Sequence, residues 1–119
     1  MEINGKTILI TGGLGSLGGG IADALKKCGA NVVIFDQDDD PKRNAFKVDV
    51  TKETEIEEAL QKIERVDVLI NCAGEIYSEP LINVMKKERH AKNSWDRVLN
   101  NNLNSCFLMS SQAAQKMAA

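Results

Sequence analysis

A glycine-dense segment near the start of the chain has the residue types and spacing of a phosphate-binding turn. Residues 11–18 read Thr-Gly-Gly-Leu-Gly-Ser-Leu-Gly, which satisfies both GxGxxG and TGxxGxxG. Without Cβ atoms the backbone can approach a diphosphate closely, and the N–H groups that open a following helix would face its charge. The alternative, a flexible glycine loop without a ligand, is disfavoured by the apolar run before it and the helical spacing after it. The segment therefore predicts a dinucleotide site with contacts from Gly12, Gly15, Ser16, Leu17 and Gly18.

A carboxylate follows at the position where a dinucleotide site would use one. Asp36 ends the apolar run at residues 31–35 and comes about 20 residues after the glycines. It could accept hydrogen bonds from both hydroxyls of an adenosine ribose, and it would repel a 2′-phosphate. We therefore expect NAD rather than NADP, although Lys42 and Arg43 are near in the sequence. The alternative is that Asp36 only begins a solvated acidic loop.

The cysteines and the single histidine offer little further chemistry. Cys28, Cys72 and Cys106 are widely spaced and form no CxxC pair, which argues against a disulfide framework and against a zinc site. Each has apolar neighbours, so we expect buried free thiols. His90 lies in the cationic stretch 86–90, where we expect a solvated loop.

Four apolar runs and three stretches of helical spacing must position these residues. Strands are expected at 6–10, 31–35, 45–48 and 66–70, and helices after the glycine turn, after Thr51 as a cap, and from Trp95 towards Met117 with Ser94 as a cap. The strands show little alternation, which indicates a parallel sheet with helices on both faces. Right-handed crossovers then give the strand order 3-2-1-4 in an incomplete Rossmann-like α/β fold. Residues 75–93 have no clean periodicity and are expected to be mostly loop.

An amide interrupts the apolar stripe of the final helix. Asn102 falls in the gap of a stripe formed by Trp95, Leu99, Cys106, Met109, Ala113 and Met117. A buried amide costs on the order of 1–3 kcal/mol unless it finds partners. We expect Asn102 to be either satisfied structurally, in a segment rich in amides, or retained for a functional site.

Length and composition describe one ordinary domain spanning residues 1–119. The chain is 43% hydrophobic and 27% charged, with a net charge of -2. Without a basic excess there is little electrostatic reason to bind nucleic acid. The first residues lack the features of a signal peptide, and no apolar run approaches the roughly 20 residues that cross a bilayer. We expect a cytoplasmic protein that does not bind membranes.

Four ordered motifs beyond the glycine turn resemble the short-chain dehydrogenase/reductase family. Asp36 matches its ribose-binding acid, and Asp49-Val50 resembles its adenine-contacting pair. Residues 71–74 (Asn-Cys-Ala-Gly) resemble its NNAG motif, with a cysteine in place of the second asparagine. Residues 95–99, followed by Asn102, resemble the segment with the active-site asparagine. The resemblance covers nearly the whole chain, and it implies cofactor contacts from Gly12, Gly15, Ser16, Leu17, Gly18, Asp36, Asp49, Val50, Asn71, Ala73 and Gly74.

The resemblance implies an NAD(P)-dependent oxidoreductase that transfers hydride between nicotinamide and an alcohol or carbonyl. In that family the matching asparagine holds a water beside a catalytic lysine, which makes Asn102 a supporting catalytic candidate. The family's catalytic tyrosine has a lysine four residues later, but Leu81 stands four residues after Tyr77, the only tyrosine. We therefore expect these 119 residues to bind the cofactor and to be inactive alone.

Two further expectations concern the end of the chain. It stops in the middle of a helix without a glycine or proline stop signal, which indicates truncation. The fourth strand would then present an unpaired edge, so we expect self-association into homo-oligomers.

Two alternative functions remain open. One is a non-catalytic NAD-binding or assembly module. The other is the family's extended branch of sugar-nucleotide epimerases and dehydratases, in which TGxxGxxG is the commoner turn; the shorter branch usually has glycine where Ser16 stands. The Asn-Cys-Ala-Gly motif and the Asn102 segment favour the shorter branch.

Overall fold

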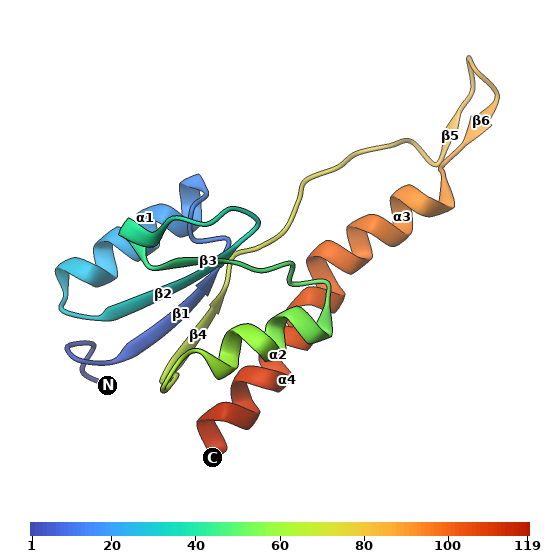
Figure 1. Ribbon diagram of the computed structural model, residues 1–119. Helices are drawn as coiled ribbons and strands as arrows, with labels where there is room; N and C mark the ends of the chain where they lie inside the picture. The colour runs from blue at the N-terminus through green and yellow to red at the C-terminus, as the bar shows by residue number, and fades with distance from the viewer.

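A four-stranded parallel sheet forms the centre of the chain, and its order confirms the topology expected from the sequence. The computed structural model describes residues 1–119. The strands are arranged β3-β2-β1-β4 (Figure 1), with bounds β1 (Thr7–Thr11), β2 (Asn31–Asp36), β3 (Ala45–Lys47) and β4 (Val68–Asn71). Thr11, at the end of β1, lies opposite Phe35 of β2 and Asn71 of β4. The carboxyl ends of these strands therefore meet at one edge of the sheet.

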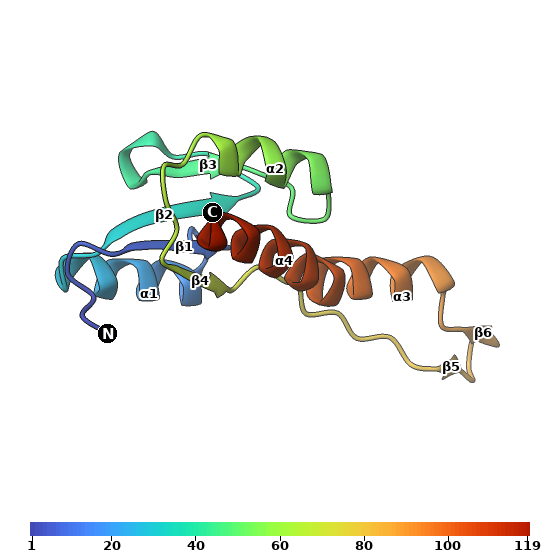
Figure 2. The same ribbon diagram turned by 90° about the horizontal axis from the view of Figure 1, so that it is seen from below.

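Helices cover both faces of the sheet and divide the core into two layers. Figure 2 shows α1 (Ser16–Lys27) on one side and α2 (Glu53–Gln61) on the other, with α4 (Ser105–Ala118) beside α2. Alternate residues of each strand point to opposite faces. One layer joins α2 and α4 to the sheet through Leu9, Val33, Phe35, Val48, Ile56, Ala59, Leu60, Ile63, Val66 and Met109. The other joins α1 to it through Ile8, Ile10, Ala22, Val32, Ile34 and Ala45.

The connection between β2 and β3 is unusually short for two parallel strands. Such strands commonly need a crossover of a dozen or more residues, whereas residues 37–44 suffice here. The connection contains one 3-10 turn, η1 (Pro41–Arg43), in which the Asp40 carboxylate accepts the N–H of Lys42 at 3.2 Å. Asn44 then adopts a left-handed φ of 57° and donates its side-chain amide to the Val32 carbonyl at 3.2 Å. Local polar contacts therefore take the place of a crossover helix.

The final helix is not the single element that the apolar stripe predicts. It consists of α3 (Lys92–Leu99), a π-helical turn (Asn100–Asn104) and α4. Ala91 is the N-cap residue, so the expected cap at Ser94 is wrong, and Ser94 lies buried inside the first turn. A π turn inserts an extra residue and rotates the helix face that follows it. Met109 and Ala113 of the stripe are buried, whereas its two ends are exposed, Trp95 by 56% and Met117 by 43%.

Residues 75–91 are mostly extended and carry a small hairpin far from the sheet (Figure 1). Its strands are β5 (Ile82–Asn83) and β6 (Glu88–Arg89), which pair antiparallel. His90, expected in a solvated loop, is only 21% exposed, and its Nδ1 lies 3.1 Å from the Glu79 carboxylate. Its ring also meets that of Trp95 edge-on. Tertiary contacts with α3 therefore shelter this histidine.

The three cysteines are free, but the prediction that they are buried is wrong. Cys28 is exposed because it lies at the C-cap of α1, beyond the face that packs on the sheet. Cys72 and Cys106 are partly exposed. No three His, Cys, Asp or Glu side chains come together as a metal site would require. None of the helices combines the length and apolarity needed to cross a membrane.

Replacing Gly18 by alanine should destabilise the fold by roughly 1–3 kcal/mol, because a Cβ at this buried position would collide with the Gly12 carbonyl oxygen. Gly20, in the same helix, has open space around it, so Gly20→Ala should stabilise by about 0.5–1 kcal/mol. Urea unfolding of the two variants measures both effects. Equal stability of the two variants would contradict the close packing of α1 against the turn.

Candidate functional site

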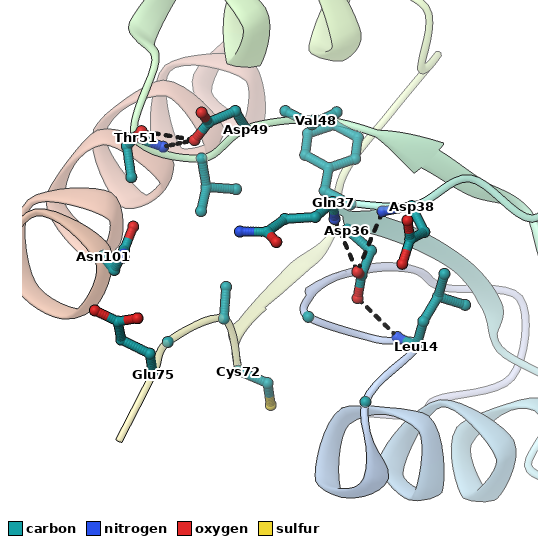
Figure 3. A pocket seen from close by; sticks show the side chains of 16 residues that line it. Leu14, Asp36, Gln37, Asp38, Val48, Asp49, Thr51, Cys72, Glu75 and Asn101 are labelled. Carbon is teal, nitrogen blue, oxygen red and sulfur yellow. Dashed lines mark hydrogen bonds between the residues drawn. The ribbon is translucent and has the colours of Figure 1, made fainter. Parts of the chain in front are cut away.

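A pocket of 490 Å³ opens at the carboxyl ends of the four parallel strands (Figure 3). The chain runs from β1 to β2 on one side and returns to β4 on the other, so the pocket lies where the strand order reverses. Such a switch point is the usual ligand site of open α/β sheets. The walls come from the segments that follow all four strands, with the lining residues Gly12, Leu14, Gly15, Phe35, Asp36, Gln37, Asp38, Val48, Asp49, Val50, Thr51, Cys72, Ala73, Gly74, Glu75 and Asn101.

The glycine turn lies directly against the backbone that follows β4. Gly12 has a φ of +68°, and a Cβ on it would lie 2.9 Å from the backbone nitrogen of Ala73. The Thr11 hydroxyl, which is buried, accepts the N–H groups of Cys72 and Ala73, both at 3.1 Å. Thr11 was not among the expected site residues; its position as the polar residue between the apolar run and the glycines was the available signal. Thr11 and Gly12 therefore join the two central walls of the pocket.

Of the five residues of the turn that the sequence predicts as cofactor contacts, two line the pocket and three do not. Gly12 and Gly15 line the pocket, and Gly15 is the N-cap residue of α1. Ser16 and Leu17 open the helix outside the lining, with Leu17 73% exposed, and Gly18 is buried beneath the turn. The first turn of α1 carries no acidic side chain. Its N–H groups and the positive end of its dipole are therefore suited to an anion.

Asp36 is held beside the glycine turn by its own carboxylate. Oδ2 accepts the N–H of Leu14 at 3.1 Å, and Oδ1 accepts that of Gln37 at 2.8 Å (Figure 3). The carboxylate thus occupies the pocket wall at the end of β2. Gln37 and Asp38 also line this wall, although neither was expected from the sequence.

Asp49, Val50 and Thr51 form the wall that follows β3. The Asp49 carboxylate accepts the Thr51 hydroxyl at 2.6 Å and the Thr51 N–H at 3.0 Å. The Thr51 hydroxyl is the main cause that holds the pKa of Asp49 below its ordinary value. The expectation that Thr51 caps the following helix is wrong, because α2 begins at Glu53 with Lys52 in the cap position. Thr51 instead fixes the rotamer of Asp49.

The Asn-Cys-Ala-Gly segment contributes to the pocket through its last three residues. Cys72, Ala73 and Gly74 line it, whereas Asn71 points to α4 and donates its side-chain amide to the Ser110 hydroxyl at 3.2 Å. Asn71, which the resemblance places among the cofactor contacts, therefore lies outside the pocket lining. Its amide instead connects the end of β4 to α4.

Asn102 lies in the π turn and fixes the backbone that leaves β4. Its Oδ1 accepts the N–H of Glu75 at 3.0 Å, and its amide donates to the Val98 carbonyl at 3.0 Å. A Cβ on Gly74 would collide with this same Oδ1. The side chain is exposed rather than buried on the apolar face, because the π turn rotates it away from the core. Asn102 lies outside the pocket lining, and its neighbour Asn101 lies in it.

Carboxylates dominate the charge of the pocket. Asp36, Asp38, Asp49 and Glu75 line it, and the lining contains no lysine or arginine. The Glu75 carboxylate is paired with Arg97 at 2.9 Å, and this hydrogen bond is the main cause that lowers the pKa of Glu75. A bound diphosphate would therefore depend on backbone N–H groups for its stabilisation.

The contact between Asp49 and Thr51 predicts a pH dependence. A carboxyl with a depressed pKa in the folded state adds stability above its unfolded pKa of about 4, and this stability is lost as the pH falls through the folded value. Thr51→Val should raise the pKa of Asp49 towards its ordinary value and reduce the loss of stability in acid.

Carboxyl ¹³C NMR titration of Asp49 checks this shift, and urea unfolding at pH 7 and pH 3 checks its effect on stability. Thr54→Val is the matched control, because Thr54 is exposed on α2. An Asp49 pKa that is the same in Thr51→Val and in the original chain would refute the assignment of its cause.

Comparisons with known proteins identify a family and individual relatives that resemble this chain. The sequence model of the family described as short chain dehydrogenase matches residues 6–119. The short chain dehydrogenase/reductase dpfgG of Gibberella zeae is 36% identical, over 98% of this chain and 47% of that protein. The type-2 3-hydroxyacyl-CoA dehydrogenase of Bos taurus is 34% identical, over 89% of this chain and 46% of its own. The chain thus spans about half the length of the curated relatives it matches.

Solved structures share the fold. A short chain dehydrogenase from Leptospira borgpetersenii, solved with bound NAD+, superposes with a TM-score of 0.81 at 30% identity, over 94% of this chain and 46% of that one. Gox2181 superposes with a TM-score of 0.82 at 23% identity, over 96% of this chain and 49% of its own. At that lower identity the likeness concerns the fold alone.

Proposed function

The chain belongs to the short-chain dehydrogenase family, and from this premise we propose that it binds NAD as the cofactor-holding part of an oxidoreductase. The observation that carries the proposal is the position of Asp36, whose carboxylate at the end of β2 accepts the Leu14 N–H of the glycine turn within the pocket. The Leptospira relative, 30% identical, was solved with NAD+ bound. That cofactor, in a protein of the same fold, supports the choice of ligand.

The residues present fit a dinucleotide. The turn at Gly12 is so close to Ala73 that only a residue without Cβ fits, which leaves bare backbone at the pocket wall. The N–H groups of the turn and of the first turn of α1 would hold the diphosphate. Asp36 would accept the hydroxyls of the adenosine ribose, and Asp49 and Val50 would border the adenine. The bound nicotinamide would supply the hydride chemistry.

The charges around Asp36 favour NAD over NADP. Asp36 and Asp38 both line the wall where a 2′-phosphate would lie, and no cation lines the pocket to balance it. Arg43, a nearby cation in the sequence, instead lies 3.4 Å from Asp23 of α1. Neither Arg43 nor Lys42, the two cations near Asp36 in the sequence, lines the pocket.

Asn102 would support hydride transfer rather than perform it. Its Oδ1 accepts the N–H of Glu75, which lines the pocket, and its amide donates to the Val98 carbonyl within the helix. The nicotinamide half of the cofactor would lie on this side of the pocket. We propose that these 119 residues hold the cofactor and do not turn over by themselves. The open edge of β4 supports the further expectation that copies of the chain associate.

Calorimetric titration should give NAD binding at least roughly tenfold tighter than NADP binding, which corresponds to about 1.4 kcal/mol. Asp36→Asn should weaken NAD by a similar factor and reduce the preference between the two cofactors. Asp39→Asn is the matched control, since Asp39 is exposed in the same acidic run and does not line the pocket. Equal affinity of the original chain for both cofactors, or no binding of either, would reject the proposal.

Mixing the purified chain with NAD and a panel of secondary alcohols should yield no NADH, as read by absorbance of the reduced nicotinamide. The physical reason is that no proton-transferring pair of tyrosine and lysine is present: Tyr77 donates its hydroxyl to Glu79 at 2.7 Å, and Leu81 stands four residues on. Alcohol-dependent NADH formation would show that another group supplies this function.

A further inference from the structure

An extended segment leaves the cofactor pocket and follows α3 towards its N-terminus. We define residues 75–79 as the strap (Figure 1). In extended chain alternate side chains point the same way. Glu75, Tyr77 and Glu79 accordingly contact α3 or its flanking residues, while Ile76 between them is fully exposed. The strap therefore has one polar face directed at the helix.

The contacts along this face form an unbroken series. The Glu75 carboxylate lies 2.9 Å from Arg97, and the Arg97 guanidinium lies 4.6 Å from the centre of the Tyr77 ring. The Tyr77 hydroxyl donates to Glu79 at 2.7 Å. The Glu79 carboxylate in turn accepts the N–H of Ala91, the cap residue of α3, at 2.6 Å. One chain of contacts thus joins the pocket wall to the start of α3.

The spacing of the two elements explains why the series can continue. Two extended residues advance about 6.7 Å, and four residues of an α-helix advance about 6 Å. The strap and α3 can therefore stay in contact along their length: Glu75 and Tyr77 both contact Arg97, and Glu79 contacts Ser94, three residues earlier on the helix. The Glu79 carboxylate lies 3.5 Å from the Ser94 hydroxyl on α3 and 3.1 Å from the ring of His90, which precedes the helix.

Arg97 is the residue of α3 that contacts two members of the strap. Its planar guanidinium can pair with a carboxylate and lie over an aromatic ring at the same time, which an ammonium does less well. The Arg97 side chain is 49% exposed and that of Glu75 33% exposed, so each contact is individually weak. Because Arg97 makes both contacts, its removal should release Glu75 and Tyr77 from α3 together.

The position of Glu75 connects the strap to the cofactor pocket. Glu75 lines the pocket, and its N–H donates to Asn102 at 3.0 Å. Gly74, the preceding residue, packs against the same Asn102 side chain. We propose that Arg97 is a positioning residue that fastens the strap to α3 and thereby orders the Gly74–Glu75 wall of the pocket. This inference rests on the proposed function for its effect on NAD, and its effect on the backbone can be measured without NAD.

Amide hydrogen exchange by NMR, on the NAD-free chain, tests the fastening. In Arg97→Met the amides of Glu75 and Ala91 should exchange roughly three- to tenfold faster, since one ion pair and one cation–π contact are lost. Arg97→Lys should fall between this variant and the original chain. Glu75→Gln combined with Arg97→Met should exchange like Arg97→Met alone, because both remove the same contact.

The matched control is Lys92→Met, which removes the 2.6 Å ion pair between Lys92 and Asp96 on the same helix without touching the strap. It should leave the exchange of Glu75 unchanged. The buried amide of Ile10 in β1 reports global stability and should exchange alike in all variants. Titration with NAD should show a similar three- to tenfold loss of affinity for Arg97→Met and none for Lys92→Met.

Unchanged exchange at Glu75 in Arg97→Met would overturn the proposal. So would faster exchange that also includes Ile10, because Arg97 would then act only on global stability. A loosened strap with unaltered NAD affinity would refute the link to the pocket. If the original chain bound no NAD at all, the proposed function would fail, while the exchange data would still decide whether Arg97 orders the pocket wall.

Discussion

The backbone contact between the turn after β1 and the segment after β4 is the constraint on which the site depends. Gly12 can approach Ala73 only because it has no Cβ and has a positive φ, and the buried Thr11 hydroxyl accepts two N–H groups from the facing segment. This contact sets the separation of the two central walls of the pocket. It also leaves bare backbone where a diphosphate would lie. The packing of Gly18 under the same turn then brings the N-terminus of α1 to this point.

The charge distribution of the pocket is consistent with binding an anion through this exposed backbone. Phosphates are commonly held by lysine or arginine, but the lining here offers carboxylates and peptide groups. The N–H groups of the helix and the turn stabilise an anion through partial positive charges. The site can therefore hold an anion although carboxylates, and no cationic side chains, line the same pocket. Asp36 and Asp49 are each held by hydrogen bonds from neighbouring residues, which keeps them at the walls. The charges of the lining therefore favour a ligand whose negative groups lie against the backbone N–H groups and away from the carboxylates.

The π turn between α3 and α4 shapes the pocket wall that follows β4. It places Asn101 in the pocket lining and brings the Asn102 oxygen to the N–H of Glu75. Beyond it α4 packs on the sheet through Met109, while α3 extends outward to carry the strap. One local change in helical geometry thus separates a helix that belongs to the core from a helix that supports the loop. Such π turns frequently occur at functional sites.

Local patterns in the sequence determined the fold and the central part of the site. Apolar runs of strand length, the glycine turn and Asp36 led to the observed strand order, and Gly12, Gly15, Asp36, Asp49, Val50, Ala73 and Gly74 do line one pocket. These features can be predicted from the sequence because hydrophobic periodicity and the conformation of a glycine turn depend on a few neighbouring residues. The π turn, the role of Thr11, the shelter of His90 and the strap were decided only in the tertiary structure. Each depends on a contact between segments far apart in the chain, such as Glu75 with Arg97, and no local pattern encodes such a pairing.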